Sequence, residues 1–189
     1  MKNPTNIIKI RTMTNKHDII WLEEVDSTNK YVREHICELD NLSVVAALKQ
    51  TAGKGQGDHK WHSEPEQNLL FSIVLKNPDI HASEQVKISD TTAESLVDLL
   101  HAHGIEAWIK PPNDIWVNKK KICGILIEHS LIGSRISWTI IGIGLNVNQT
   151  IFPSDLPNPT SMSLENKGAD IKALLVEYMD IFISRASWL

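Results

Sequence analysis

The stretch EAWIKPPNDIWVNKKKICGILIE, from Glu106 to Glu128, decides the fold class, because it holds three short segments rich in β-branched and aromatic residues. These segments are Glu106–Ile109, Ile115–Val117 and Ile122–Glu128, and short runs of this kind between turn residues predict strands. Asn118-Lys119-Lys120 predicts a hairpin turn between the last two. Since strands joined by short turns pair antiparallel, this part of the chain predicts an antiparallel sheet.

Apolar patterning on either side of this stretch extends the sheet and adds helices. Further strands are predicted at Ile19–Val25, Val44–Leu48, Asn68–Leu75 and Ser137–Leu145. Helical apolar spacing predicts helices over Lys30–Leu39, from a cap at Ser83 to about His103, and over Ile171–Phe182. The order of these elements predicts an α+β fold, with a mixed, largely antiparallel β-sheet and the helices packed on one face.

Length and composition bound the kind of protein. The chain has 189 residues, 42% of them apolar and 22% charged, which suits one folded domain without disulfides or a structural metal. We expect residues 1–17 to form a short polar leader and residues 18–189 to form that domain. The net charge of −4 argues against a general nucleic-acid binder. No apolar run is long enough for a membrane span, and no secretory signal is present, so the cytoplasm is the expected compartment.

The loop QTAGKGQGDHKW, from Gln50 to Trp61, is the first candidate binding element. It has three glycines in five residues, which let the backbone approach a ligand closely. Lys54 and Lys60 add positive charge, and exposed amides can surround an anion. The loop is not a P-loop, because no Gly-Lys-Ser/Thr follows at the required spacing. A mobile connection between strands is the alternative that loop chemistry alone favours.

Two further motifs carry candidate side chains. In Lys110-Pro111-Pro112-Asn113-Asp114 the prolines hold Lys110 extended, so that its ammonium can meet a carboxylate or phosphate; a rigid turn with a solvated lysine is the alternative. In Gly142-Ile143-Gly144-Leu145-Asn146 the glycines indicate a close backbone approach, and Asn146 either presents its amide to a ligand or caps the turn. The histidine pairs 59/62 and 101/103 match no metal motif, so we expect no metal ligands on the protein.

Taken in order, these motifs resemble the biotin–protein ligase family. The resemblance runs from about Trp21 to about Asn148, and its motifs are Val25-Asp26-Ser27-Thr28-Asn29, Gln50–Gly55 with Lys60-Trp61, Lys110–Asp114, Gly124–Glu128 and Gly142–Asn146. It implies the catalytic domain of a biotin–[acetyl-CoA-carboxylase] ligase. It also implies the biotin–lipoate ligase fold, which is related to that of class II aminoacyl-tRNA synthetases.

The resemblance further implies a ligase reaction in two steps, with ATP and Mg²⁺ as cofactors. The carboxylate of biotin attacks the α-phosphate of ATP, which gives biotinyl-5'-AMP and pyrophosphate. A specific lysine of a biotin carboxyl carrier domain then takes the biotin and releases AMP. Fixed cations and Mg²⁺ have to offset the repulsion between the two anions. The implied partners are biotin, ATP and the carrier domain, without DNA or membrane, and homodimerisation is left open.

Each implied role falls on a residue of this sequence. Lys110 matches the lysine that neutralises the carboxylate and phosphate, and it is the implied catalytic residue. The positions that match biotin contacts are Ser27, Thr28, Asn29, Gln50, Lys54, Gly55, Gln56 and Lys110. The positions that match adenylate or ATP contacts are Gly53, Lys54, Trp61, Asn113 and Asn146. Trp61 is implied to stack on adenine, with a core indole as the ordinary alternative. No protein ligand for Mg²⁺ is identifiable.

The sequence also departs from the family pattern. Lys54 and Gln56 stand where arginines are common, and Pro111 stands in place of a tryptophan. The bidentate guanidinium of arginine is replaced by a compact ammonium at Lys54 and by a neutral amide at Gln56. We therefore expect weaker retention of the adenylate. We expect the family's C-terminal β-barrel and N-terminal winged-helix DNA-binding domain to be absent. Two alternatives stay open: a lipoate or octanoate ligase or transferase on the related fold, and a protein that binds biotin or its adenylate with impaired transfer.

Overall fold

The computed structural model describes residues 10–13, 18–112 and 114–188, and these residues contain one sheet of eight strands in the order β1-β2-β3-β4-β8-β7-β6-β5. The strands are β1 (Ile10–Met13), β2 (Asp18–Val25), β3 (Val44–Gln50), β4 (Leu69–Lys76), β5 (Ala107–Lys110), β6 (Asp114–Val117), β7 (Lys120–Ile132) and β8 (Arg135–Leu145). The helices are α1 (Thr28–Glu34), η1 (Ala82–Glu84), α2 (Val86–Ala102), α3 (Met162–Glu165) and α4 (Ile171–Arg185). β2 and β3 pair in parallel across α1, and the other neighbours pair antiparallel. The predicted α+β class with a mixed, largely antiparallel sheet is confirmed.

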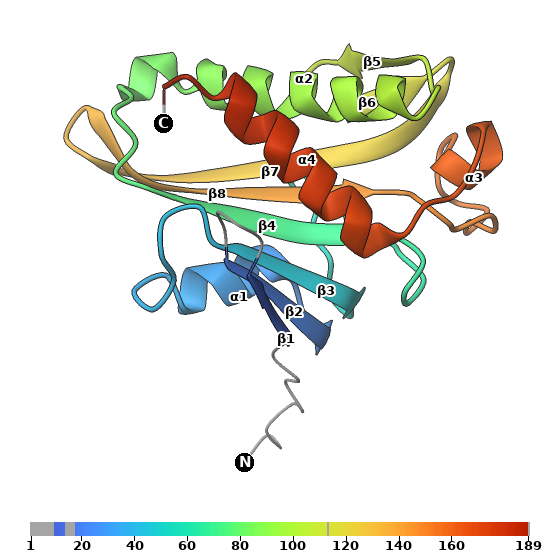
Figure 1. Ribbon diagram of the computed structural model, residues 1–189, viewed down its shortest axis with the longest axis horizontal. Helices are drawn as coiled ribbons and strands as arrows, with labels where there is room; N and C mark the ends of the chain where they lie inside the picture. Colours follow the sequence, from blue (N-terminus) through green and yellow to red (C-terminus); the bar gives the residue numbers. More distant parts are fainter. Residues whose placement is uncertain (1–9, 14–17, 113, 189) are drawn as a thin grey trace.

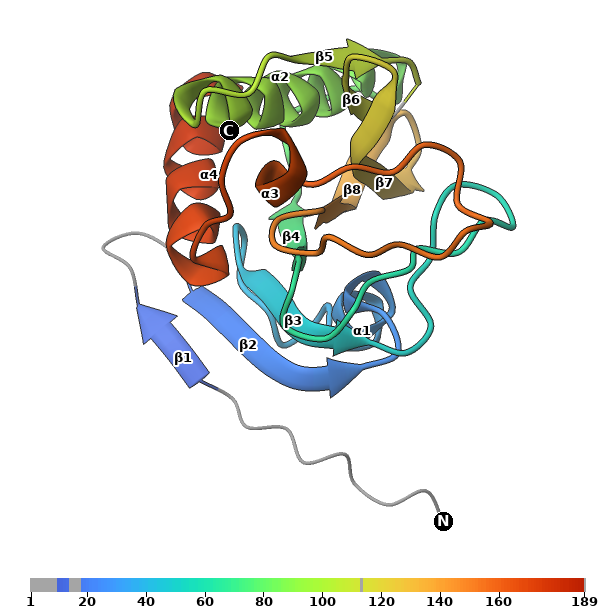
Figure 2. The ribbon, with the colours of Figure 1, turned by 90° about the vertical axis from the view of Figure 1, so that its right-hand side faces the viewer.

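Consecutive residues of the central strands face two different cores. Val44 and Ala46 of β3 belong to the large core with residues of α2 and α4, whereas Val45 and Ala47 belong to a smaller core with residues of α1. Thus α2 and α4 cover one face of the sheet, and α1 packs on the other (Figure 1, Figure 2). The expectation that the helices share one face is therefore wrong for α1. The burial of β4 agrees with this arrangement, because a strand is buried along nearly its whole length only when both faces of the sheet are covered there.

The large core fixes α4 across the sheet. Tyr178 and Phe182 of α4 are fully buried, and the ring of Tyr178 meets Phe71 of β4 edge-on at a centroid distance of 5.4 Å. The carboxylate of Asp170 caps the helix by accepting the N–H groups of Lys172 and Ala173. This layer leaves the opposite face, next to α1, for a binding site.

β7 and β8 are longer than predicted and form a hairpin. Their shared turn contains Gly133 at φ +61°, and the predicted turn between β6 and β7 is present with Asn118 at φ +53°. The extension of β7 beyond Glu128 begins with the polar His129 and Ser130 and ends with the exposed Leu131 and Ile132, so the apolar run that predicted the strand stops short of it.

β1 shortens the expected leader. Residues 10–13 pair with residues 18–21 of β2, so Ile10 lies opposite Trp21. β1 lies at the edge of the sheet, beside β2. The apolar pattern that predicts strands begins only at β2, so residues 10–13 were expected to belong to the leader. The remaining residues of that leader lie outside the described residues. No helix within the described residues is long and apolar enough to cross a membrane.

Candidate functional site

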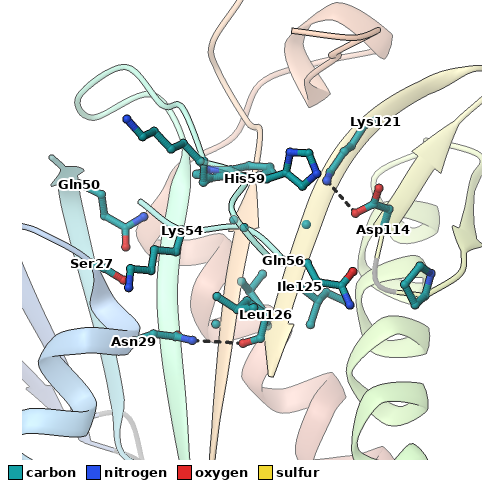
Figure 3. A pocket seen from close by; sticks show the side chains of 18 of the residues that line it. Ser27, Asn29, Gln50, Lys54, Gln56, His59, Asp114, Lys121, Ile125 and Leu126 are labelled. Carbon is teal, nitrogen blue, oxygen red and sulfur yellow. Dashed lines mark hydrogen bonds and ion pairs between the residues drawn. The ribbon is translucent and has the colours of Figure 1, made fainter. Parts of the chain in front are cut away.

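A cavity of about 530 Å³ lies between the start of α1, the loop 51–61, the β5–β6 turn and the middle of the β7–β8 hairpin (Figure 3). The fold brings together segments that are far apart in the sequence. Most of the predicted site residues line this cavity, namely Ser27, Thr28, Asn29, Gln50, Lys54, Gly55, Gln56, Trp61 and Lys110.

Glycines in β7 and β8 make room for the side chains of the cavity. A methyl group on Gly142 would lie 2.2 Å from Oδ1 of Asn29, and one on Gly144 would lie 2.5 Å from Cε2 of Trp61. A methyl group on Gly124 would also meet the Trp61 ring, at 2.9 Å. The close backbone approach predicted for residues 142–146 is therefore present, and it places the Trp61 indole against the hairpin.

One end of the cavity is a buried hydrogen-bonding array at the start of α1. Gln50 Oε1 accepts the backbone N–H of Thr28 at 2.8 Å, and Asn29 Nδ2 donates to Glu128 Oε2 at 2.9 Å. The hydroxyl of Ser72 lies 2.6 Å from Asn29 Oδ1 and 2.8 Å from Thr28 Oγ1. Thr28 and Asn29 are each only 4% exposed. The array is thus fixed before a ligand arrives. Ser72 was not predicted, because it is a lone serine in an apolar strand.

The loop after β3 folds over the cavity as a small hairpin of its own. The N–H of Gly55 donates to His59 O at 2.8 Å, and the N–H of Trp61 donates to Gly53 O at 3.0 Å. Lys54 and His59 line the cavity from this loop, whereas Gly53 is buried at its base and does not. These bonds give the loop a defined hairpin shape.

Two lysines are held in place on the other side of the cavity. Lys121 Nζ lies 2.7 Å from Asp114 Oδ1 and 5.6 Å from the centroid of the Trp61 ring. Lys110 Nζ lies 3.6 Å from the centroid of the Trp116 ring. Together with the two lysines of the covering loop they make the wall strongly positive, since Asp114 is the one carboxylate among the described lining residues. This end of the cavity suits an anion.

Lys121 was missed by sequence reasoning because of a β-bulge, whereas Trp116 follows the ordinary alternation of β6 and belongs to none of the motifs. In the β6–β7 register Trp116 lies opposite Lys121, and Ile122 has no partner on β6. The bulge turns Lys121 toward the cavity, although strict alternation from Gly124 would point it toward the core. One signal could have revealed the bulge: strict alternation along β7 would place the charged side chain of Lys121 in the apolar core.

Asn146 is not among the described residues that line the cavity. Asn146 Nδ2 donates to Thr160 O at 2.9 Å, which agrees with a role in the turn. Asn146 Oδ1 and Trp61 Nε1 are buried without a hydrogen-bond partner among the described residues. Since buried polar atoms usually have partners, both are candidates to meet polar groups of a ligand. Asn113 lies outside the described residues.

Metal and thiol groups take no visible part in the site. Within residues 10–13, 18–112 and 114–188, no group of three or more His, Cys, Asp or Glu side chains is placed to hold a metal ion. Cys123 neighbours Gly124 but belongs to the large core, and burial raises the pKa of its thiol far above the ordinary value. That thiol therefore stays protonated and is a poor nucleophile.

The fold and the cavity define an α+β domain with a cavity that has a buried hydrogen-bonding end and a cationic end. The chain belongs to the family described as Biotin/lipoate A/B protein ligase family, whose model matches residues 21–146. The resemblance to biotin–protein ligases that the motifs indicated is confirmed by this match and by the relatives below.

Two curated relatives illustrate the similarity. The chain is 40% identical over 151 residues to the Bifunctional ligase/repressor BirA of Bacillus subtilis, an alignment that covers 79% of this chain and 46% of that protein. It is 34% identical over 129 residues to the Biotin--[acetyl-CoA-carboxylase] ligase of Paracoccus denitrificans, which covers 67% of this chain and 53% of the relative. The chain thus spans about half the length of the curated relatives it matches.

Solved structures agree with this family. A biotin protein ligase from Aquifex aeolicus in complex with biotin and ATP superposes with a TM-score of 0.72 at 29% identity, over 88% of this chain and 69% of that one. The ligase from Leishmania major in complex with biotinyl-5-AMP gives a TM-score of 0.70 at 27% identity, over 90% of this chain and 75% of the other.

Proposed function

We propose that the chain is the catalytic domain of an ATP-dependent biotin–protein ligase. It activates biotin as biotinyl-5'-AMP and transfers it to a lysine of a biotin carboxyl carrier domain. The proposal rests on one observation: a single cavity of about 530 Å³ has a buried hydrogen-bonding end and a cationic end. The relatives solved with biotin and ATP or with biotinyl-5-AMP support it.

The hydrogen-bonding end is assigned to the ureido ring of biotin. That ring offers N–H donors and a carbonyl acceptor, which the hydroxyls of Ser27 and Thr28 and the amides of Asn29 and Gln50 can satisfy. Ser72 holds two of these groups in place.

The cationic end is assigned to the meeting of carboxylate and nucleotide. A carboxylate oxygen of biotin attacks the α-phosphorus, and the bond from that phosphorus to the pyrophosphate oxygen breaks. Lys121 and Lys110 offset the repulsion between the two anions. The ion pair with Asp114 fixes the Lys121 ammonium beside Trp61, so it needs little reorganisation during the reaction. Lys121 thus joins Lys110, the cation that the sequence alone assigned to this role.

Mg²⁺ is assigned to the nucleotide rather than to a protein cage. Asp114 is the one described carboxylate in the cavity wall, and Lys121 already engages it. This donor set fits an ion that takes most of its ligands from phosphate oxygens and water, as Mg²⁺ does with nucleotides. When bound, the ion would supply further positive charge to the leaving pyrophosphate.

The adenine is assigned to the exposed side of the Trp61 ring, with the unpaired Asn146 Oδ1 and Trp61 Nε1 as candidate polar contacts. Gly53, at the base of the covering loop, and Asn113, which the motif assigns, complete the proposed nucleotide contacts. In the second step the acceptor amine attacks the acyl carbon, the bond to the AMP oxygen breaks, and the amine loses a proton. The covering loop excludes water from the adenylate meanwhile. We assign the reaction to the cytoplasm.

The test is a reconstituted reaction with the chain, biotin, MgATP and a biotin carboxyl carrier domain. Biotin-dependent release of pyrophosphate, together with a mass increase of the carrier, is the expected result. Release of pyrophosphate without carrier modification would instead identify a protein that forms and holds the adenylate. Preference for lipoate or octanoate in direct competition would identify the lipoate branch of the family. No binding of biotin by calorimetry would overturn the proposal.

A further inference from the structure

Glu128 of β7 lies behind the hydrogen-bonding end of the cavity and contacts it through Asn29. Its side chain is 32% exposed, and Glu128 is not among the described residues that line the cavity. One carboxylate oxygen pairs with Arg33, and the other accepts from Asn29 Nδ2 at 2.9 Å. Arg33 and Asn29 lie one turn apart on α1, so both side chains reach the same strand. The two steps of the proposed reaction use neither charge of this ion pair.

The carboxylate fixes which way the Asn29 amide points. On that side of the amide lie Glu128 Oε2 and, at 3.2 Å, the carbonyl oxygen of Leu126, and both can only accept hydrogen bonds (Figure 3). The amide nitrogen has to face these two oxygens. Asn29 Oδ1 then faces Ser72 Oγ, at 2.6 Å, and Ser72 has to donate to it.

This donation decides the direction of the remaining hydrogen bonds, because a hydroxyl has a single proton. Ser72 Oγ also lies 2.8 Å from Thr28 Oγ1, but its proton is already given to Asn29, so at this contact it can only accept. The Thr28 proton goes to Ser72 or to Gln50 Oε1, which is 3.2 Å away. In either case Thr28 Oγ1 keeps its lone pairs for a molecule in the cavity that it lines.

We propose that Glu128 is a positioning residue that determines ligand specificity from outside the cavity. By fixing the Asn29 amide, it sets the direction of the hydrogen bonds from Thr28 through Ser72 and makes Thr28 an acceptor for a ureido N–H of biotin. The negative charge at the end of this chain also polarises it in the same direction. This inference rests on the proposed function and deepens it: a ligand with an oxygen in place of that N–H brings lone pairs against lone pairs and is rejected.

The experiment uses biotin and its two cyclic carbamate analogues, in each of which a ring oxygen replaces one ureido N–H. Calorimetry gives the Kd of each ligand for the wild-type chain and for Glu128→Leu, which removes both carboxylate oxygens. At least one analogue should bind the wild type roughly tenfold more weakly than biotin. In Glu128→Leu the amide is free to turn and Thr28 to donate, so this ratio should fall about threefold or more. Glu128→Gln keeps an acceptor for Asn29 and should keep most of the ratio.

The ratio separates positioning from a purely structural role, because damage to the pocket would weaken all three ligands alike. Glu34→Leu is the matched control, since it removes a carboxylate of α1 that faces Lys30 and takes no part in the chain. This variant should leave the ratio unchanged. The same ratio in Glu128→Leu as in the wild type would overturn the inference.

A measurement without ligand separates this inference from the proposed function. Hydrogen exchange of the Asn29 side-chain amide, followed by NMR, should be about tenfold faster in Glu128→Leu, because the amide loses the closer of its two acceptors. Equal exchange rates in the two chains would also overturn the inference. A wild-type chain that binds no biotin but shows the exchange difference would sink the proposed function alone and would support the hold of Glu128 on Asn29.

Discussion

Gly144→Ala is expected to displace the Trp61 indole and weaken nucleotide binding while the fold is kept. The added methyl carbon would lie 2.5, 2.7 and 2.8 Å from Cε2, Nε1 and Cζ2 of the ring. Ordinary contacts between carbon atoms are about 3.5–4.0 Å, so the ring has to move by about 1 Å. Gly144 does not have a positive φ, so the strand itself accepts alanine. Overpacking of this kind costs about 1–3 kcal/mol of the free energy of unfolding.

The assay is urea unfolding of four chains: wild type, Gly144→Ala, Trp61→Ala and the double variant. Without the indole, the methyl group meets no ring, and its cost should fall within about 0.5 kcal/mol of zero. Calorimetry with MgATP should show a Kd about tenfold higher for Gly144→Ala, the equivalent of about 1.4 kcal/mol, with biotin affinity near wild type. Stability losses that simply add in the double variant would refute the reasoning, because the methyl group would then not act through Trp61.

The other predictions concern charge and thiol reactivity. Lys121→Met should lower the rate of biotin-dependent pyrophosphate release roughly 100- to 1,000-fold with the unfolding curve unchanged, as loss of one preorganised charge does, and a near-normal rate would remove the lysine from the mechanism. Lys110→Ala should also abolish efficient adenylation in the same assay. Gln56→Arg should lengthen the half-life of bound adenylate in a chase experiment, because a charge-assisted hydrogen bond is worth roughly 1.5–3 kcal/mol, and an equal half-life would contradict this. Iodoacetamide at pH 8–9 should label the exposed Cys37 and spare Cys123, because burial raises the pKa of the Cys123 thiol and keeps it protonated; two labels on the native chain would contradict the burial.

The residues that depart from the family pattern all line the cavity. Gln56 lines the wall as a neutral amide, and the lysines around it supply charge without a bidentate fork. Pro111 replaces an aromatic residue at the start of the turn, and the aromatic face under Lys110 comes instead from Trp116 on the next strand. The chain thus reaches a cationic wall by contacts that its own β6 provides.

Much of the fold was legible in the sequence because its signals are local. Apolar runs between turn residues located every strand of the described sheet except β1. The glycine loop, the Lys-Pro-Pro-Asn-Asp turn and the Gly-Ile-Gly-Leu-Asn strand end marked segments that do meet at the cavity. The family followed from the order of these motifs. The roles of individual residues such as Asn113 and Asn146 stay predictions, since motif matching assigns a position and not a contact.

Tertiary structure alone decided which face each element takes. A strand that is apolar at every position, such as Val44–Ala47, carries no record of which side a helix will cover, so the place of α1 could not be predicted. The bulge at Ile122 reversed the facing of Lys121. The contact of Lys110 with Trp116 depends on the register between β5 and β6. Strand register is set by contacts between distant residues, whereas the sequence reports chiefly on neighbours along the chain.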